Sequence, residues 1–224
     1  MARPSKNIDQ LLLHSGRRLY PLHGYAGLSV RQLCEHAGVN AGMFHYHFQS
    51  KNNFLSTLLQ QLYDEVFTQL QAQATQPASA LQRLRLALNR LARLMRAHGD
   101  WVSRVWTDAG SGDAVAQDFL RRNAPRHMQL LMVLAQEAAQ AGELAALPPL
   151  QGFGFMMGSV LAPMVLLPGA LRLGMLPAAL TSSVHHDVLS DAAIAQRVDH
   201  ALAALAVPSG KFFPTGLPED TPDA

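Results

Sequence analysis

The sequence predicts an all-α fold, with a three-helix N-terminal unit, a larger helical domain and about nine helices in total. Apolar residues recur at helical spacing in every long periodic segment, and no stretch alternates with the period of two that marks a strand. Glycine and proline separate these segments and form no fixed repeat. The 224 residues are 49% apolar and 15% charged, which excludes a disordered chain.

The first three helices form the predicted N-terminal domain, residues 1–52. The first helix covers residues 8–20 and ends where a proline and a glycine follow. Two short helices, 29–37 and 41–48, flank Gly38, a residue that tolerates the positive φ of a tight turn.

The larger predicted domain covers residues 53–207, and residues 208–224 form an expected flexible tail with four prolines. Ser50 and Ser79 are favourable caps for its first two helices. The periodic segments predict helices over residues 50–74, 79–98, 100–106, 113–140, 151–171 and 191–207. The stretch between the last two of these helices is expected to be irregular.

The charge of the chain divides unevenly. Residues 1–53 contain six basic and two acidic side chains, a net charge of +4, whereas the remainder carries −2. A basic N-terminal unit joined to a slightly acidic domain indicates that only the first part meets a polyanion.

The single cysteine, Cys34, excludes an intramolecular disulfide, and its place on an apolar stripe favours a core residue over a redox sensor. The first residues lack the apolar segment of a signal peptide, so we expect a cytoplasmic protein.

Between Glu143 and Arg172 the chain has no charged residue, which raises the possibility of a membrane span. Four prolines, four glycines and the absence of flanking basic clusters argue against it. We therefore predict a helix buried in the core or in a dimer interface, and no membrane partner. A membrane-associated regulator is the alternative.

Residues 28–51 have the pattern of a DNA-reading helix-turn-helix. Asn40 can cap the second helix, and Phe44 and Phe48 anchor that helix to the core. The short side chains left on its outer face would allow it to enter a major groove, with polar side chains beside it on the phosphates. A three-helix packing motif without a DNA role is the alternative. The predicted DNA-binding residues are Ser29, Arg31, Asn40, Ala41, Gly42, Met43, His45, Tyr46, His47 and Lys51.

This segment resembles the N-terminal domain of the TetR (tetracycline repressor) family over about residues 5–60. The matching positions are Ser29, Leu33-Cys34, Ala37-Gly38-Val39-Asn40, Gly42-Met43-Phe44-His45, Phe48 and Ser50-Lys51. The resemblance implies that Ser29, His45 and Lys51 contact phosphate, that Ala41, Met43 and Tyr46 face the bases, and that a helical ligand-binding, dimerising domain follows. His45 and Met43 replace the family's usual tyrosine and threonine, so the operator sequence cannot be transferred from a relative.

Methionine and aromatic side chains of the larger domain indicate an adaptable apolar effector pocket. The predicted lining residues are Trp101, Trp106, Met128, Met132, Phe153, Met156 and Met157. His98, Arg104 and Asp108 could add polar contacts, and plain core packing is the alternative for the apolar residues. The helices from Gln151 and Asp191 are the predicted four-helix interface of a homodimer, and completion of the monomer core is the alternative.

The sequence thus predicts a cytoplasmic, dimeric transcriptional regulator whose partners are double-stranded DNA, a second copy and an unidentified small-molecule effector. A small apolar or amphipathic effector would release it, as a repressor, from a near-palindromic operator. No catalytic motif is present, so we expect no enzyme and no cofactor. His185 and His186 are adjacent, and adjacent side chains point in different directions on a helix. We therefore expect no metal site at these two histidines. The alternative is a helical carrier or enzyme with a vestigial DNA-binding domain.

Overall fold

The computed structural model describes residues 7–207, and every regular element in that range is a helix. The elements are α1 (Ile8–Gly27), α2 (Val30–Ala37), α3 (Ala41–Phe48), α4 (Lys51–Ala74), α5 (Ala80–Ala97), α6 (Gly99–Gly110), α7 (Ala114–Gln140), α8 (Pro149–Met156), the π-helix η1 (Met157–Leu161), α9 (Ala162–Arg172), α10 (Ala178–Thr181), the π-helix η2 (His185–Leu189) and α11 (Asp191–Ala204). The predicted all-α fold is confirmed. The predicted tail, residues 208–224, lies outside the described residues.

Within residues 7–207, the eleven α-helices exceed the nine expected, because two regions of the larger domain are more finely divided than the periodicity indicated. The apolar segment forms α8, η1 and α9 in direct succession. The π-helical turn of η1 comes just before Pro163, whose ring would collide with the carbonyl four residues earlier in a regular α-helix. The stretch expected to be irregular contains α10 and η2.

The first helix is longer than predicted. Instead of ending near Pro21, α1 continues to Gly27 with the proline inside it. Gly24 interrupts the helical geometry with φ 64° and ψ −174°. The chain therefore changes direction at Gly24, one turn before the segment that leads into α2.

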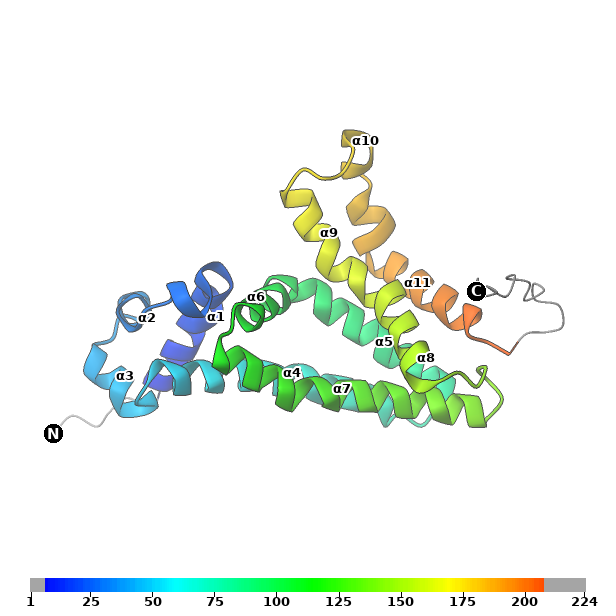
Figure 1. Ribbon diagram of the computed structural model, residues 1–224, viewed down its shortest axis with the longest axis horizontal. Coiled ribbons are helices and arrows are strands. Elements are labelled where there is room, and N and C mark those ends of the chain that lie inside the picture. The colour runs from blue at the N-terminus through cyan, green and yellow to red at the C-terminus, as the bar shows by residue number, and fades with distance from the viewer. Residues whose placement is uncertain (1–6, 208–224) are drawn as a thin grey trace, which may run out of the picture.

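The helices form an elongated molecule with the N-terminal unit at one end (Figure 1). α4, α5 and α7 pack on one another and make the body of the larger domain. α4 runs from the N-terminal unit along this body, α6 contacts α1, and α8, α9 and α11 lie beyond α5 (Figure 1). The predicted boundary at residue 52 falls in the first turn of α4, so one continuous helix joins the two parts.

Two apolar cores form along this body. The smaller core joins α1, α2 and α3 to the first turns of α4, and it also includes Val105, Val115 and Ala116 from α6 and α7. The larger core joins the rest of α4 to α5, α7, α8, α9 and α11. The N-terminal unit therefore shares its core with α6 and α7.

The helix from Pro149 to Arg172 is long and apolar enough to cross a membrane by length and composition alone. Only 17% of its most apolar window is buried. Met156, Val160 and Met164 are fully buried in the larger core, whereas Leu150, Phe155, Leu166 and Leu173 are exposed, together with Met175 and Leu180 just beyond the helix. The helix thus has one face in the core and one apolar face on the surface.

Candidate DNA-binding surface

In the N-terminal unit, side-chain contacts join the end of α1 to the start of α4. Lys51 donates hydrogen bonds from Nζ to the carbonyl oxygens of Tyr25 (2.8 Å) and Leu28 (3.0 Å). Its Nζ also lies 4.2 Å from the centre of the Tyr25 ring, a cation–π contact. The Tyr25 hydroxyl donates to Asn52 Oδ1 at 2.6 Å. These contacts fix the segment that leads into α2.

α2 begins with a capping box formed by Ser29 and Gln32. The Gln32 amide donates to Ser29 Oγ at 3.2 Å, and the Ser29 amide donates to Gln32 Oε1 at 2.8 Å. Two backbone donors at the helix start are therefore satisfied. The Ser29 hydroxyl also donates to Gln32 Oε1 at 2.7 Å, so a phosphate contact from it requires that hydrogen bond to break.

The turn between α2 and α3 has the geometry that the sequence predicts. Gly38 adopts φ 68° and ψ 30°, the left-handed conformation that favours glycine. Asn40 then caps α3, since its Oδ1 accepts a hydrogen bond of 3.0 Å from the Met43 amide.

α3 is held to the smaller core by aromatic packing. Phe44 is fully buried and Phe48 nearly so. Together with Phe54 of α4 they form a cluster whose ring centres are 4.9–5.7 Å apart. Because this side of α3 is fixed inside, its opposite side is held outward as a rigid surface.

The outward side of α3 has small residues at its start and rings at its end. Ala41, Gly42, His45 and Tyr46 are exposed, Tyr46 by 73%, and Met43 is partly buried. This arrangement, small residues first and longer ones after, suits insertion of the N-terminal end of the helix into a major groove.

Two histidines on α3 have different surroundings. His45 Nδ1 lies 3.1 Å from the carbonyl oxygen of Gln49, which makes Nδ1 the donor. A phosphate contact from His45 would therefore use Nε2, which carries a hydrogen in the imidazolium form. His47 is partly buried, and its Nε2 has no hydrogen-bond partner among the described residues.

Arg31 lies on the exposed side of α2, where its Nε donates to Glu35 at 2.7 Å. An exposed ion pair of this kind contributes little free energy, so the guanidinium can exchange Glu35 for a phosphate at small cost. Nine of the ten predicted DNA-binding residues lie on α2, α3 or the residues that cap them, and Lys51 is the first residue of α4, at the same end of the molecule (Figure 1).

A contact between α1 and α6 was not predicted. Asp108 of α6 is buried and accepts a hydrogen bond of 2.8 Å from the Tyr25 amide. A Cβ on Gly24 would lie 2.7 Å from Asp108 Oδ1, and Arg104 donates to the carbonyl of Pro21 at 3.3 Å. From the sequence alone, Arg104 and Asp108 are only candidate effector contacts, because a buried aspartate on a short helix has the same local pattern as a solvated one.

The predicted effector-lining residues are divided among several surroundings. Met156 is fully buried in the larger core, with Phe153 and Met157 packed against that core. Trp101 belongs to the smaller core, with its ring 5.1 Å from Tyr20. Trp106 is 61% exposed. Met128 and Met132 are partly buried on α7.

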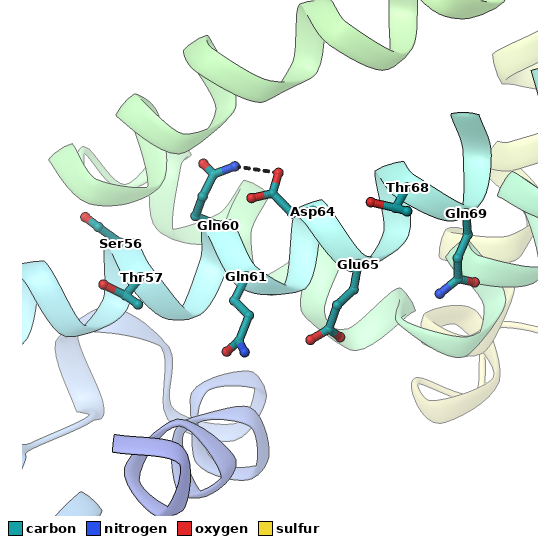
Figure 2. Close-up of a pocket in the computed structure, with 8 residues that line it drawn as sticks. All are labelled: Ser56, Thr57, Gln60, Gln61, Asp64, Glu65, Thr68 and Gln69. Carbon is teal, nitrogen blue, oxygen red and sulfur yellow. Dashed lines mark hydrogen bonds between the residues drawn. The ribbon is translucent and has the colours of Figure 1, made fainter. Parts of the chain in front are cut away.

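A surface groove of about 990 Å³ follows α4 instead (Figure 2). Its lining residues are polar and belong to α4 alone: Ser56, Thr57, Gln60, Gln61, Asp64, Glu65, Thr68 and Gln69. Gln60 and Asp64 are hydrogen-bonded at 3.0 Å. Glu65 pairs with Arg17 of α1, and the hydrogen bond lowers the pKa of its carboxyl. An effector pocket lined by the predicted methionine and aromatic residues remains a prediction.

Comparison with known proteins gives independent evidence on the family. A model of the bacterial regulatory proteins of the tetR family matches residues 12–58. YuxN, an uncharacterized HTH-type transcriptional regulator of Bacillus subtilis (strain 168), is 26% identical over 98 residues, which are 44% of this chain and 34% of that protein. The match thus spans about a third of the relative's length.

Solved structures share the fold across nearly the whole chain. A candidate fatty acid metabolism regulator of Clostridium perfringens has a TM-score of 0.68 at 14% identity, covering 88% of this chain and all of that one. FadR of Bacillus subtilis, solved with stearoyl-CoA, has a TM-score of 0.61 at 15% identity, covering 81% of this chain and 98% of that one. The resemblance of the helix-turn-helix segment is confirmed, as is the expectation of a regulator and not an enzyme. Residues 12–58 thus match the tetR family of bacterial regulatory proteins, and the chain as a whole has the fold of solved structures described as tetR-family regulators.

Proposed function

We propose that this protein is a cytoplasmic homodimeric repressor, which leaves a near-palindromic operator when a small apolar or amphipathic effector binds its larger domain. The observation that carries the proposal is the exposed face of α3, with Tyr46 held outward by the buried Phe44 and Phe48. Ala41, Met43 and Tyr46 would face the bases, while Ser29, Arg31, His45 and Lys51 would contact phosphates.

The DNA-reading role can be tested by fluorescence anisotropy with the intergenic DNA upstream of the protein's own gene. Tyr46→Ala should lower the affinity by about 1–3 kcal/mol, the size of a lost base contact. Trp106→Ala removes another exposed aromatic side chain, on α6, and should leave the affinity unchanged. Binding should weaken steeply with salt, because phosphate contacts release counterions. A wild-type protein without salt-sensitive, sequence-selective binding would contradict the proposal.

The homodimer is supported by the exposed apolar face of α8, η1 and α9. Leu166 and Leu173 are 66% and 75% exposed, and Leu150 and Met175 extend the same kind of surface. Large exposed apolar side chains of this kind are typical of an interface. A second copy is the occupant that fits the fold, since one chain carries one α3 and a palindromic operator needs two, one duplex turn apart.

The dimer can be tested by light scattering coupled to size exclusion. Leu166→Asp should convert the dimer to monomer and weaken operator binding. Leu22→Asp is the matched control, because Leu22 of α1 is 70% exposed but lies outside this face. A Leu166→Asp variant that stays dimeric, or a monomeric wild-type protein, would contradict the dimer proposal.

The contact between Asp108 and the Tyr25 amide supports a route from effector to DNA. It joins α6 of the larger domain to the residue whose carbonyl is held by Lys51, immediately before the helix-turn-helix. In this proposal α6 has two positions, one in the DNA-bound form and one in the released form. An effector that binds one of these forms more tightly would change the spacing of the two copies of α3. FadR, of the same fold, was solved with stearoyl-CoA, which supports an amphipathic effector here.

The effector can be sought by native mass spectrometry of the purified protein. A co-purifying mass that is lost on denaturation, and whose addition to stripped protein weakens operator binding, is the expected result. DNA affinity that responds to no co-purifying or added apolar compound would argue against ligand control and leave the DNA-binding proposal intact.

A further inference from the structure

A second groove, of about 410 Å³, lies between α4, α5 and α11, near the end of α4 that is farther from α3. Three of its lining residues are Arg85, Arg90 and Arg93 of α5, and no aspartate or glutamate is among the lining residues. The remainder of the lining is neutral, with amides and the apolar side chains of Ala72, Leu86 and Ala195. The groove is therefore positively charged.

The three guanidinium groups differ in how far their donors are satisfied. Arg85 forms an ion pair with Asp199 of α11 through two hydrogen bonds, one of them at 2.7 Å. Arg90 donates one hydrogen bond, to Gln69 Oε1. Arg93 donates none within residues 7–207, and its Nε is buried without an acceptor. Since each guanidinium has five N–H groups, Arg90 and Arg93 retain nine unused donors between them.

The charges of these two arginines are also poorly balanced. Arg93 lies 3.6 Å from Asp191 Oδ2, but Asp191 accepts its hydrogen bond from Arg96, at 2.8 Å. Arg90 forms no ion pair in the described part of the chain. Arg90 and Arg93 are three residues apart on one helix, so the two like charges are neighbours and repel each other. An anion between them would remove the repulsion and accept the unused donors.

We propose that this groove binds a small molecule through a phosphate group held by Arg90 and Arg93. A phosphate monoester carries a charge approaching −2 near pH 7, which matches two guanidinium groups better than a single carboxylate does. The volume is within the range of small-molecule sites and exceeds the space that phosphate alone needs. The organic part of the ligand would lie against Ala72, Leu86 and Ala195. This proposal does not rest on the proposed DNA-binding function, because the groove lies outside the DNA-binding surface.

Isothermal titration of the DNA-free protein tests the site with phenyl phosphate, inorganic phosphate and benzoate at constant ionic strength. Phenyl phosphate should bind more tightly than inorganic phosphate, and benzoate more weakly than either. Replacing Arg90→Gln and Arg93→Gln together should weaken phenyl phosphate binding at least about tenfold, the effect of a lost charge-assisted hydrogen bond. Arg122→Gln, at an exposed arginine of α7 outside the groove, should leave binding unchanged.

Thermal unfolding without ligand separates binding from packing. The double variant should unfold at the same temperature as the wild type or higher, since a repulsion is removed. Equal phenyl phosphate affinity in the double variant and the wild type would overturn the proposal. So would wild-type binding of benzoate as tight as that of phenyl phosphate, or no wild-type binding at all. If the double variant does not fold, Arg90→Gln alone is titrated against the same criteria.

Discussion

Large apolar residues are buried at one end of this molecule and exposed on another surface. The first region is the proposed DNA-reading end, formed by α1, α2, α3 and the start of α4, and the second is the α8–α9 face, formed by α8, η1 and α9. At the DNA-reading end, Phe44 and Phe54 are fully buried against each other, and the exposed side of α3 is small or polar except for Tyr46. On the other face, Leu166 and Leu173 remain exposed on a helix whose opposite side is buried. The first surface is complete within one chain, whereas the second has apolar area that only another molecule can cover.

This difference has a physical reason. A recognition helix must be fixed by its own chain, because its outer side meets a hydrated, charged groove. A dimer interface, the role proposed for the α8–α9 face, needs the reverse, an apolar surface that is stable in solution only when a copy covers it. Substitutions that change stability or operator binding at one of these two regions, and not at the other, therefore test the difference between them.

The largest effect is expected from Phe44→Ala, which should lower the free energy of unfolding by about 3–5 kcal/mol, the cost of removing a buried phenyl ring. Phe155→Ala, the same change at an exposed residue of α8, should cost less than about 1 kcal/mol in protein too dilute to associate. Urea unfolding measures both. Equal losses would show that the two surfaces do not differ as described.

The same contrast explains what the sequence could predict. Caps, turns and aromatic spacing are local signals, so the bounds of α2 and α3, the Gly38 turn and the Asn40 cap could all be predicted. The π-turn at η1 and the extension of α1 past Pro21 could not, because they depend on packing between helices. For the same reason the sequence did not indicate that Asp108 binds the Tyr25 amide, or that Lys51 donates to backbone carbonyls.

Two glycines of the DNA-reading end should differ in their tolerance of a side chain. Both have positive φ, but Gly38 lies in the left-handed α region, where alanine costs about 1–2 kcal/mol, whereas Gly24, with ψ −174°, lies in a region that is essentially restricted to glycine. Gly38 faces open space, whereas a Cβ at Gly24 would meet Asp108 and Arg104 within 3 Å. Gly24→Ala should therefore destabilise the protein by at least about 1 kcal/mol more than Gly38→Ala. Equal unfolding free energies would argue against a tight contact between α1 and α6.

Smaller effects are expected from the caps at the two ends. Ser29→Ala removes the capping box of α2, and Ser190→Ala removes the cap of α11. Each should cost about 1 kcal/mol in urea unfolding. Only Ser29→Ala should also weaken operator binding, because it removes a proposed phosphate contact and disturbs the segment that positions the helix-turn-helix. If Ser190→Ala weakened operator binding as much, cap loss would act through overall stability alone.

The smallest expected effect is a pH dependence from two histidines between the ends. Burial lowers the pKa of His127 on α7, and burial together with nearby Arg17 lowers the pKa of His98, between α5 and α6. The unfolded chain, with its ordinary value near 6.5, then binds protons before the folded chain does. The contribution of the two neutral histidines to the free energy of unfolding is fully present above pH 6.5 and should fall as the pH drops below that value.

Urea unfolding between pH 7.5 and 5 isolates this effect from the carboxylates. Arginine partners lower the pKa values of the Glu65 and Asp199 carboxyls. These two groups therefore lose their contribution to stability only as the pH falls below the ordinary range of carboxyl pKa values. His127→Gln should reduce the loss of stability on acidification, and His98→Gln should reduce it further, whereas His23→Gln, at an exposed residue, should not. Full retention of the pH dependence in the double histidine variant would show that neither buried imidazole stays neutral on folding.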